Sequence, residues 1–197
     1  IMKMFCIFCR FLKIYIVWEM HQILPHHSKD SDVLKYSLFY KKVDGIIFHS
    51  ERDKKRVKEI LIVIEDKKCV VIPHGNFNDS YVNNISRESA RMKLGIEPND
   101  KVILCFGFIR KNRGYEFLIE AVKEMKDITV LIVGNKQDEE TLDRLKQYEK
   151  EYNFVRLIVG WVPDDDIQIY FNACDFVVLP YTDIYTSGVV PLSYAFN

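Results

Sequence analysis

A stretch between residues 102 and 121 restricts the fold more than any other part of the sequence. The apolar run Val102–Phe106 predicts a buried strand that Gly107 ends, and a helix is expected to begin at about Tyr115. The loop between them contains three cations, Arg110, Lys111 and Arg113. A loop between a strand and a helix lies at the carboxyl edge of a parallel sheet, where helix amides and guanidinium groups can bind an anion. The stretch therefore predicts a binding site for a diphosphate.

Strands and helices are expected to alternate along the chain. Buried strands are expected at Ile14–Trp18, Ile46–Phe48, Cys69–Ile72, Ile128–Gly134, Val155–Val159 and Asp175–Tyr181. Helices are expected over residues 31–43, 86–94 and 138–150, and after Ser50, Gly114 and Pro163. The helix after Gly114 is expected to bury Leu118, Ala121, Val122 and Met125. This alternation predicts an α/β protein with parallel sheets.

Several residues carry helix-end signals. Ser50 and Ser86 are expected N-caps, and Gly95 is expected just past a helix end. The acidic run Asp164–Asp166 suggests either a metal site or the start of a helix. Adjacent carboxylates on a helix point in different directions, so the helix start is the preferred interpretation.

Four segments, in order along the chain, resemble the GT-B glycosyltransferases of family 4, also called glycosyl transferases group 1. The first is Trp18–His21 with Pro25 and His26, and the second is Ile72–Phe77. The third is Phe106–Arg110 together with Arg113, Gly114 and Leu118–Ala121, and the fourth is Pro180–Phe196. The resemblance implies a GT-B-like α/β fold with two incomplete Rossmann-like domains and parallel sheets. Residues 1–82 would be the C-terminal part of the acceptor-side domain. Residues 83–197 would be the N-terminal part of the domain that binds a nucleotide-sugar donor.

The same resemblance implies a function. It suggests a retaining glycosyltransferase, or a fragment of one, that transfers a sugar from a nucleotide-diphosphate donor to a polysaccharide or glycolipid acceptor. An alternative is a catalytically inactive, nucleotide-binding or partner-binding remnant of such an enzyme. The nucleotide-sugar would be the substrate, and neither a cofactor nor a metal is expected.

Donor-binding residues follow from the resemblance, position by position. It implies diphosphate contacts by Gly107, Arg110, Arg113, Ser187, Gly188 and Val189, and nucleobase or ribose contacts by Trp161, Val162 and Ser193. Arginine stands where lysine is usual, which keeps the charge, and a guanidinium can bind phosphate through two donors at once. The interpretation without the resemblance is that Arg110 and Arg113 are solvated loop cations. Tyr185 and Ser193 stand near two positions where many relatives have glutamate.

Histidines are the other candidates. The resemblance implies that His21 contacts the transferring sugar, and that His74 and Gly75 line the cleft or form a hinge. His21 could instead be a loop residue that binds a backbone carbonyl. A metal set of His21, His26 and His27 is not expected, because no carboxylate follows them at a useful spacing.

Charge and cysteine content restrict partners and compartment. Lys and Arg balance Asp and Glu at 28 each, but twelve of the cations and only six of the acids precede residue 59. The basic run Lys54–Arg56 is expected to be a solvated helix face, and contact with an anionic membrane surface is the alternative. No aromatic stacking platform accompanies it, so nucleic acid is not an expected partner. The five cysteines, Cys6 and Cys9 among them, lie in apolar surroundings and suggest packed thiols in a cytoplasmic protein. If the basic part binds lipid, the protein would lie at the inner face of the membrane.

Overall fold

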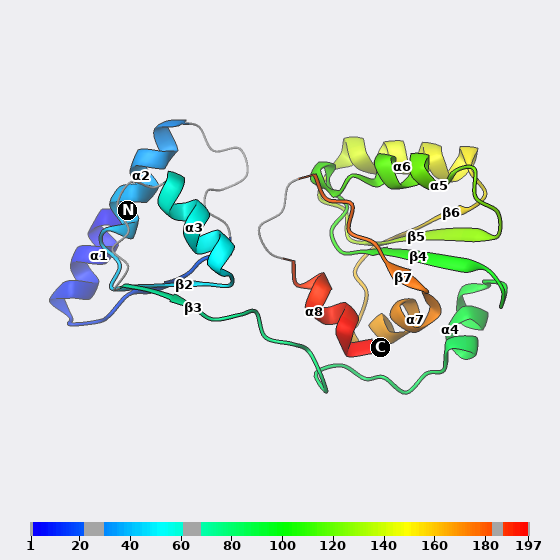
Figure 1. The fold of residues 1–197 in the computed structure, drawn as a ribbon, viewed down its shortest axis with the longest axis horizontal. Coiled ribbons are helices and arrows are strands. Elements are labelled where there is room, and N and C mark those ends of the chain that lie inside the picture. The colour runs from blue at the N-terminus through cyan, green and yellow to red at the C-terminus, as the bar shows by residue number, and fades with distance from the viewer. Residues whose placement is uncertain (1, 22–29, 61–67, 183–186, 197) are drawn as a thin grey trace. The chain divides into compact units, whose positions relative to one another are not determined.

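The computed structural model describes residues 2–21, 30–60, 68–182 and 187–196. The chain divides into two compact units, Ile1–Gly75 and Asn76–Asn197 (Figure 1). The domain boundary that the sequence suggested lies seven residues later, after residue 82.

The first unit contains a parallel three-stranded sheet. Its strands, in the order β1-β2-β3, are Val17–Glu19, Gly45–Phe48 and Cys69–Val71. Its helices are α1 (Met2–Phe11), α2 (Asp30–Tyr40) and α3 (Glu51–Ile60). Phe39, Val43, Ile46, Phe48 and Val57 are buried between these elements. The central strand β2 is thus covered, as a strand with two neighbours in a parallel sheet should be.

The two edge strands of this sheet differ from the prediction. We expected a buried strand over Ile14–Trp18, but β1 begins at Val17 and all three of its residues are exposed. The amide of Ile16 donates a hydrogen bond to the carboxylate of Asp44, 2.8 Å away, and its carbonyl accepts the amide of Asp44 at 2.8 Å. Ile16 is therefore held by Asp44, the residue before β2, at the point where β1 begins. Strand β3 is likewise only half-buried, because it pairs on one side alone.

The second unit contains a parallel four-stranded sheet in the order β6-β5-β4-β7. The strands are β4 (Lys101–Phe106), β5 (Ile128–Gly134), β6 (Val155–Val159) and β7 (Phe176–Val177). The chain adds β5 and β6 on one side of β4 and then crosses to add β7 on the other side. The direction of winding therefore reverses at β4, and the carboxyl end of that strand is where ligands bind in open α/β sheets.

Helices cover both faces of this sheet (Figure 1). Helices α5 (Tyr115–Val122) and α6 (Glu139–Glu151) pack on one face against Ile103, Cys105, Val130 and Ile132. Helices α4 (Arg87–Leu94), α7 (Asp164–Ala173) and α8 (Val189–Ser193) lie on the other face, with Val102, Leu104, Leu131 and Val133. The strand side chains of these two groups alternate along β4 and β5, so both interior strands are apolar on both faces.

Most helix ends agree with the sequence. The Ser86 hydroxyl accepts the amide of Ser89 at 3.2 Å, and Gly95 has a φ of +60° after α4. Ser50 accepts the amide of Asp53 at 3.0 Å at the start of α3. The predicted face of α5 was partly wrong: Ala121 and Met125 are exposed. The helix ends at Val122 and buries residues 115, 118, 119 and 122, a spacing that places them on one stripe.

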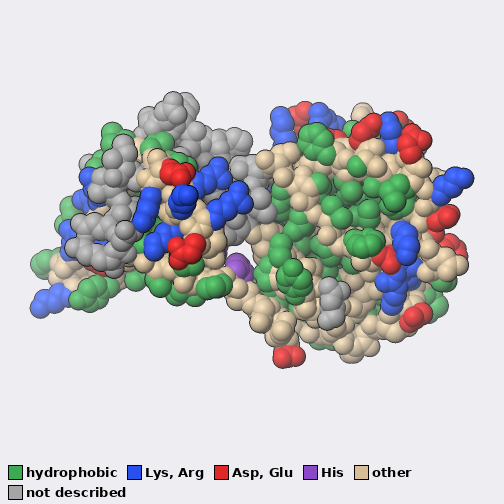
Figure 2. Space-filling model, viewed as in Figure 1, with side chains coloured by type: hydrophobic (Ala, Val, Ile, Leu, Met, Phe, Trp, Pro, Cys, Tyr) green, Lys and Arg blue, Asp and Glu red, His purple; other side chains and the backbone are tan. Residues whose placement is uncertain are grey.

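Two surface features of the first unit bear on its partners. Helix α1 buries Cys6 and Cys9 and exposes the large apolar side chains Met4, Phe5, Ile7, Phe8 and Phe11. Lys and Arg side chains gather on the viewed face of this unit in Figure 2. Within the described parts of the chain, no helix combines the length and the apolar character that crossing a bilayer requires.

Candidate functional site

Three glycines shape the carboxyl edge of the second sheet. Gly107, Gly134 and Gly160 lie at the ends of β4, β5 and β6, with φ values of +113°, +153° and +149°. A Cβ on Gly134 would lie 1.9 Å from the carbonyl oxygen of Gly107, which no side chain permits. The strand ends therefore approach one another closely and form a surface made of backbone.

The basic loop is fixed against the exit of β7. Residues Lys111–Arg113 form a 3-10 turn that Gly114, at a φ of +65°, connects to α5. A Cβ on Gly114 would lie 2.1 Å from the carbonyl oxygen of Pro180. The amide of Thr182 also donates to the carbonyl of Asn112 at 3.1 Å. The loop therefore contacts the segment after β7 at two points.

Arg113 is a buried cation within this loop. Its side chain is 8% exposed, its Nε donates to the carbonyl of Phe108 at 3.2 Å, and its guanidinium lies 4.0 Å from the centre of the Tyr181 ring. Burial lowers its pKa, the nearby Arg110 lowers it further, and Tyr181 opposes both. An arginine stays protonated in such surroundings, so the loop holds a fixed positive charge.

Arg110 adds a second cation without a counter-charge. Its Nε is buried and has no hydrogen-bond partner among the described residues. In the part of the chain that the structure describes, neither Arg110 nor Arg113 forms an ion pair with a carboxylate. Two close guanidinium groups, one with an unsatisfied donor, favour an anionic ligand.

The segment after β7 also lies beside Gly107 and Arg113. The Cβ position of Gly107 lies 3.6 Å from Nη2 of Arg113 and 3.7 Å from Cγ2 of Val189. The Ser187 hydroxyl accepts the amide of Val189 at 3.3 Å, and Gly188 is exposed. Burial raises the pKa of Tyr181, while Arg113 and Ser187 act in the opposite direction. Helix α8 has only five residues, so its dipole adds less to anion binding than a long helix would.

A cavity of about 220 Å³ lies along the strand ends. Its lining includes Tyr81, Phe106, Gly107, Asn135, Trp161, Val162 and Leu192. Trp161 is 73% exposed, so its ring is available to a ligand. Ser193 does not line this cavity, and its hydroxyl donates to the carbonyl of Val190 at 2.7 Å within α8. The structure thus brings Gly107, Trp161 and Val162 to one cavity and leaves Ser193 outside it.

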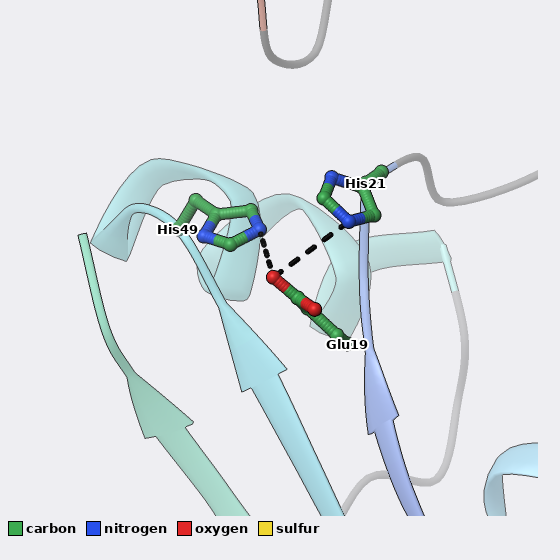
Figure 3. Close-up of side chains that lie close together, drawn as sticks. All are labelled: Glu19, His21 and His49. Atoms are coloured by element: carbon green, nitrogen blue, oxygen red, sulfur yellow. Dashed lines mark ion pairs between the residues drawn. The ribbon is translucent and has the colours of Figure 1, made fainter. Parts of the chain in front are cut away.

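The first unit places histidines at the ends of its parallel strands. His21 follows β1, His49 follows β2 and His74 follows β3. The ring centres of His21 and His74 lie 5.0 and 5.4 Å from that of His49. Nδ1 of His74 lies 2.9 Å from the carbonyl oxygen of Gly75. Figure 3 shows His21 and His49 directed at the carboxylate of Glu19.

The residues predicted from the sequence did not include Glu19, His49 or Tyr181. A signal existed for each: Glu19 and His21 directly follow one predicted strand, and His49 directly follows the next. Tyr181 ends the last predicted strand, at the edge where Gly107 lies. His26, His27 and Tyr185 lie outside the described residues.

Comparison with known proteins supplies further evidence. A family profile described as "Glycosyl transferases group 1" matches residues 86–192. Mannosylfructose-phosphate synthase of Agrobacterium fabrum is 30% identical over 186 residues, covering 83% of this chain and 40% of the relative. GDP-mannose:glycolipid 4-beta-D-mannosyltransferase of Xanthomonas campestris pv. campestris is 25% identical over 124 residues, covering 62% of this chain and 33% of the relative.

Solved structures share the fold. Anabaena HepE in complex with UDP-glucose superposes with a TM-score of 0.79 at 17% identity. That match covers 96% of this chain and 53% of HepE. The chain therefore spans 40% or less of the length of the two curated relatives and about half of HepE.

Proposed function

The chain belongs to the glycosyl transferases group 1, and from this premise we propose that it is part of a retaining glycosyltransferase. The reaction transfers a sugar from a nucleotide-diphosphate donor to an acceptor in a polysaccharide or a glycolipid. The observation that carries the proposal is the pair Arg110 and Arg113, two cations without a carboxylate partner among the described residues.

The chemistry requires stabilisation of a leaving group. As the bond between the anomeric carbon and the diphosphate breaks, negative charge develops on the leaving phosphate oxygen. Guanidinium groups that are already held in position stabilise this charge more in the transition state than in the ground state. The Phe108 carbonyl and the Tyr181 ring hold Arg113 in one orientation, so little reorganisation is needed. This step needs no metal.

The cavity beside the loop suits the nucleoside. It adjoins Gly107, where a ligand can approach the backbone closely, and Trp161 offers an exposed aromatic surface for a base. The names of the relatives mention GDP-mannose and UDP-glucose, which differ in base and sugar. We therefore propose a nucleoside diphosphate at this position, with the base to be determined by titration.

His21 is the candidate residue for contact with the reacting sugar. It follows a parallel strand at the carboxyl edge of the first sheet, where substrate-binding residues gather in α/β proteins. The acceptor is proposed to be a saccharide or a lipid-linked saccharide, in line with the glycolipid named for the Xanthomonas relative.

Replacement of Arg113 tests the proposal. In the longer protein that contains this chain, Arg113→Ala should cost about 2–4 kcal/mol of transition-state stabilisation, because one fixed charge is lost at the leaving group. The measurement is kcat/KM for release of a radiolabelled sugar from its nucleotide donor. Arg144→Ala is the matched control, since it removes an exposed arginine from helix α6. Equal turnover of the Arg113 and Arg144 variants would rule out the assigned role.

The alternative is an inactive protein that binds nucleotides or a partner. It uses the same loop and cavity, so the two hypotheses agree on nucleotide binding and differ in turnover. Binding of UDP, GDP or ADP that depends on Arg113, without release of sugar from any donor, would select the inactive protein.

A further inference from the structure

Tyr181 has a second functional group besides the ring that stacks on Arg113. Its hydroxyl oxygen is buried and has no hydrogen-bond partner among the described residues. A buried tyrosine usually places its hydroxyl against an acceptor, and an unpaired buried donor is costly. The hydroxyl therefore lacks a partner that a ligand can supply.

Tyr115 shows how a structural tyrosine is arranged in the same cluster. Its side chain is 4% exposed, and its hydroxyl donates to the carbonyl of Phe108 at 3.4 Å. Nε of Arg113 donates to the same carbonyl at 3.2 Å. Within the described part of this cluster, the buried side-chain atoms left unpaired are the hydroxyl of Tyr181 and Nε of Arg110. Both belong to residues that border the candidate diphosphate site.

The unpaired hydroxyl lies among the groups expected to bind the diphosphate. The guanidinium of Arg113 is 4.0 Å from the centre of the Tyr181 ring. Nη2 of Arg113 is 3.6 Å from the Cβ position of Gly107, at the backbone surface that the strand ends form. The Ser187 hydroxyl, which accepts the amide of Val189 at 3.3 Å, lies on the other side of Tyr181. An anion held by Arg113 beside Gly107 would therefore lie within reach of Tyr181.

The hydroxyl keeps its proton at neutral pH. Burial raises the pKa of Tyr181 and outweighs the opposing effects of Arg113 and Ser187. A neutral phenol can donate a hydrogen bond to a phosphate oxygen, and it adds no negative charge that would repel the ligand. Tyr181 thus complements the cations of the loop.

We propose that the hydroxyl of Tyr181 donates a hydrogen bond to the diphosphate of the nucleotide-sugar, beside the guanidinium of Arg113. This inference rests on the proposed function, because it adds a ligand to the same site. The ring of Tyr181 holds Arg113, and the hydroxyl binds the phosphate directly. The hydroxyl has no contact with solvent in this structure, but the residue as a whole is only half-buried. A movement of neighbouring side chains on binding is therefore part of the proposal.

Tyr181→Phe tests the hydroxyl separately from the ring, because phenylalanine keeps an aromatic face for Arg113. The chain is titrated with UDP, GDP and ADP by calorimetry, and the variant is compared for the nucleotide that the wild type binds most tightly. Affinity should fall about tenfold or more, the effect of losing one hydrogen bond to a charged group.

Stability should change differently from affinity. Without nucleotide, the free energy of unfolding of Tyr181→Phe should equal or exceed that of the wild type, because an unpaired buried hydroxyl is removed. A tyrosine with a merely structural role would instead lose stability and keep its affinity for nucleotide.

Tyr115→Phe is the matched control. It removes a buried hydroxyl of the same cluster whose hydrogen bond lies within the chain. The change should therefore lower the free energy of unfolding and leave nucleotide affinity as in the wild type.

The outcomes separate this inference from the proposed function. Wild-type affinity in Tyr181→Phe, together with weaker binding in Arg113→Ala, would overturn the role of the hydroxyl and leave the diphosphate site in place. Equal losses of affinity or of stability in Tyr181→Phe and Tyr115→Phe would also overturn that role. If the wild type binds none of the three nucleotides, the diphosphate site is wrong, and this inference is wrong with it.

Discussion

Gly114 shows how a single residue positions the candidate donor loop. It has a φ of +65°, and it approaches Pro180 too closely for any side chain. This contact holds the loop of Arg110 and Arg113 against the segment that leads to Ser187. The position of the two cations therefore depends on a residue that has no side chain of its own.

Gly114→Ala should lower the free energy of unfolding by about 3 kcal/mol or more, measured by denaturant titration. Gly95→Ala is the matched control, because Gly95 has a φ of +60° and open space around its Cβ position. The backbone conformation alone costs about 1–2 kcal/mol for a residue with a side chain. The difference between the two variants thus measures the clash with Pro180. Equal losses would contradict the close contact.

Local signals predicted some residues and not others. Ser86 and Gly95 were predicted correctly, because capping depends on neighbours a few residues away. Arg110 and Arg113 were chosen as anion ligands from their place between a strand and a helix, and that role stays a prediction. The stacking of Tyr181 on Arg113 and the meeting of His49 with Glu19 are long-range contacts. No local pattern encodes such pairs until the strand order is known.

Among the elements, helix α4 is joined to the sheet through one carboxylate. Asp175 accepts the amide of Val102 at 2.7 Å and pairs with Arg91 at 2.9 Å. Arg91 is buried, and its Nε donates to the carbonyl of Ala173 at 3.1 Å. Burial raises the pKa of Asp175, but the Val102 amide and the nearby arginines outweigh it and hold the pKa below its usual value.

Asp175→Asn should therefore lower the free energy of unfolding at pH 7 by about 2 kcal/mol, since it leaves the buried Arg91 without its counter-charge. Because the folded-state pKa is depressed, this stabilisation is present above the usual pKa of an aspartate. It is lost as the pH falls through the folded-state pKa. Unfolding measured from pH 7 to pH 3 should show the wild type approaching the variant at the acid end.

Asp143→Asn serves as the control for this variant. Its carboxylate forms an exposed pair with Lys146, which should contribute little to stability. A constant gap between wild type and Asp175→Asn over the whole pH range would contradict the assigned pairing.

Five of the seven strands that the structure describes were predicted to within one residue, and β1 and β7 were not. Strands β4 and β5 have neighbours on both sides and largely apolar sequences, as expected for buried strands of a parallel sheet. The edge strands β3 and β6 also have the expected bounds within one residue. Strand β1 is shorter than the apolar run before it, and β7 keeps only two residues of the run that was expected. Both strands lie at a sheet edge, where an apolar run can extend beyond the last ladder partner, so composition alone overestimated these two.

At the scale of the whole molecule, the chain consists of two α/β units that resemble parts of the two domains of larger relatives. The parallel sheets and the GT-B fold were predicted from the sequence and are confirmed by the similarity to solved structures. The assignment of the units to acceptor and donor sides stays a prediction. It places nucleotide binding in the second unit and the proposed sugar contact of His21 in the first.

The most direct test of the central claim is a calorimetric titration of the chain with UDP, GDP and ADP. We expect one of these nucleotides to bind at a single site. Its affinity should fall at least about tenfold in Arg113→Ala, the loss that corresponds to about 1.4 kcal/mol, and stay unchanged in Arg144→Ala. Binding that is equal in both variants, or no binding of any of the three nucleotides, would contradict the assignment of the loop as a diphosphate site.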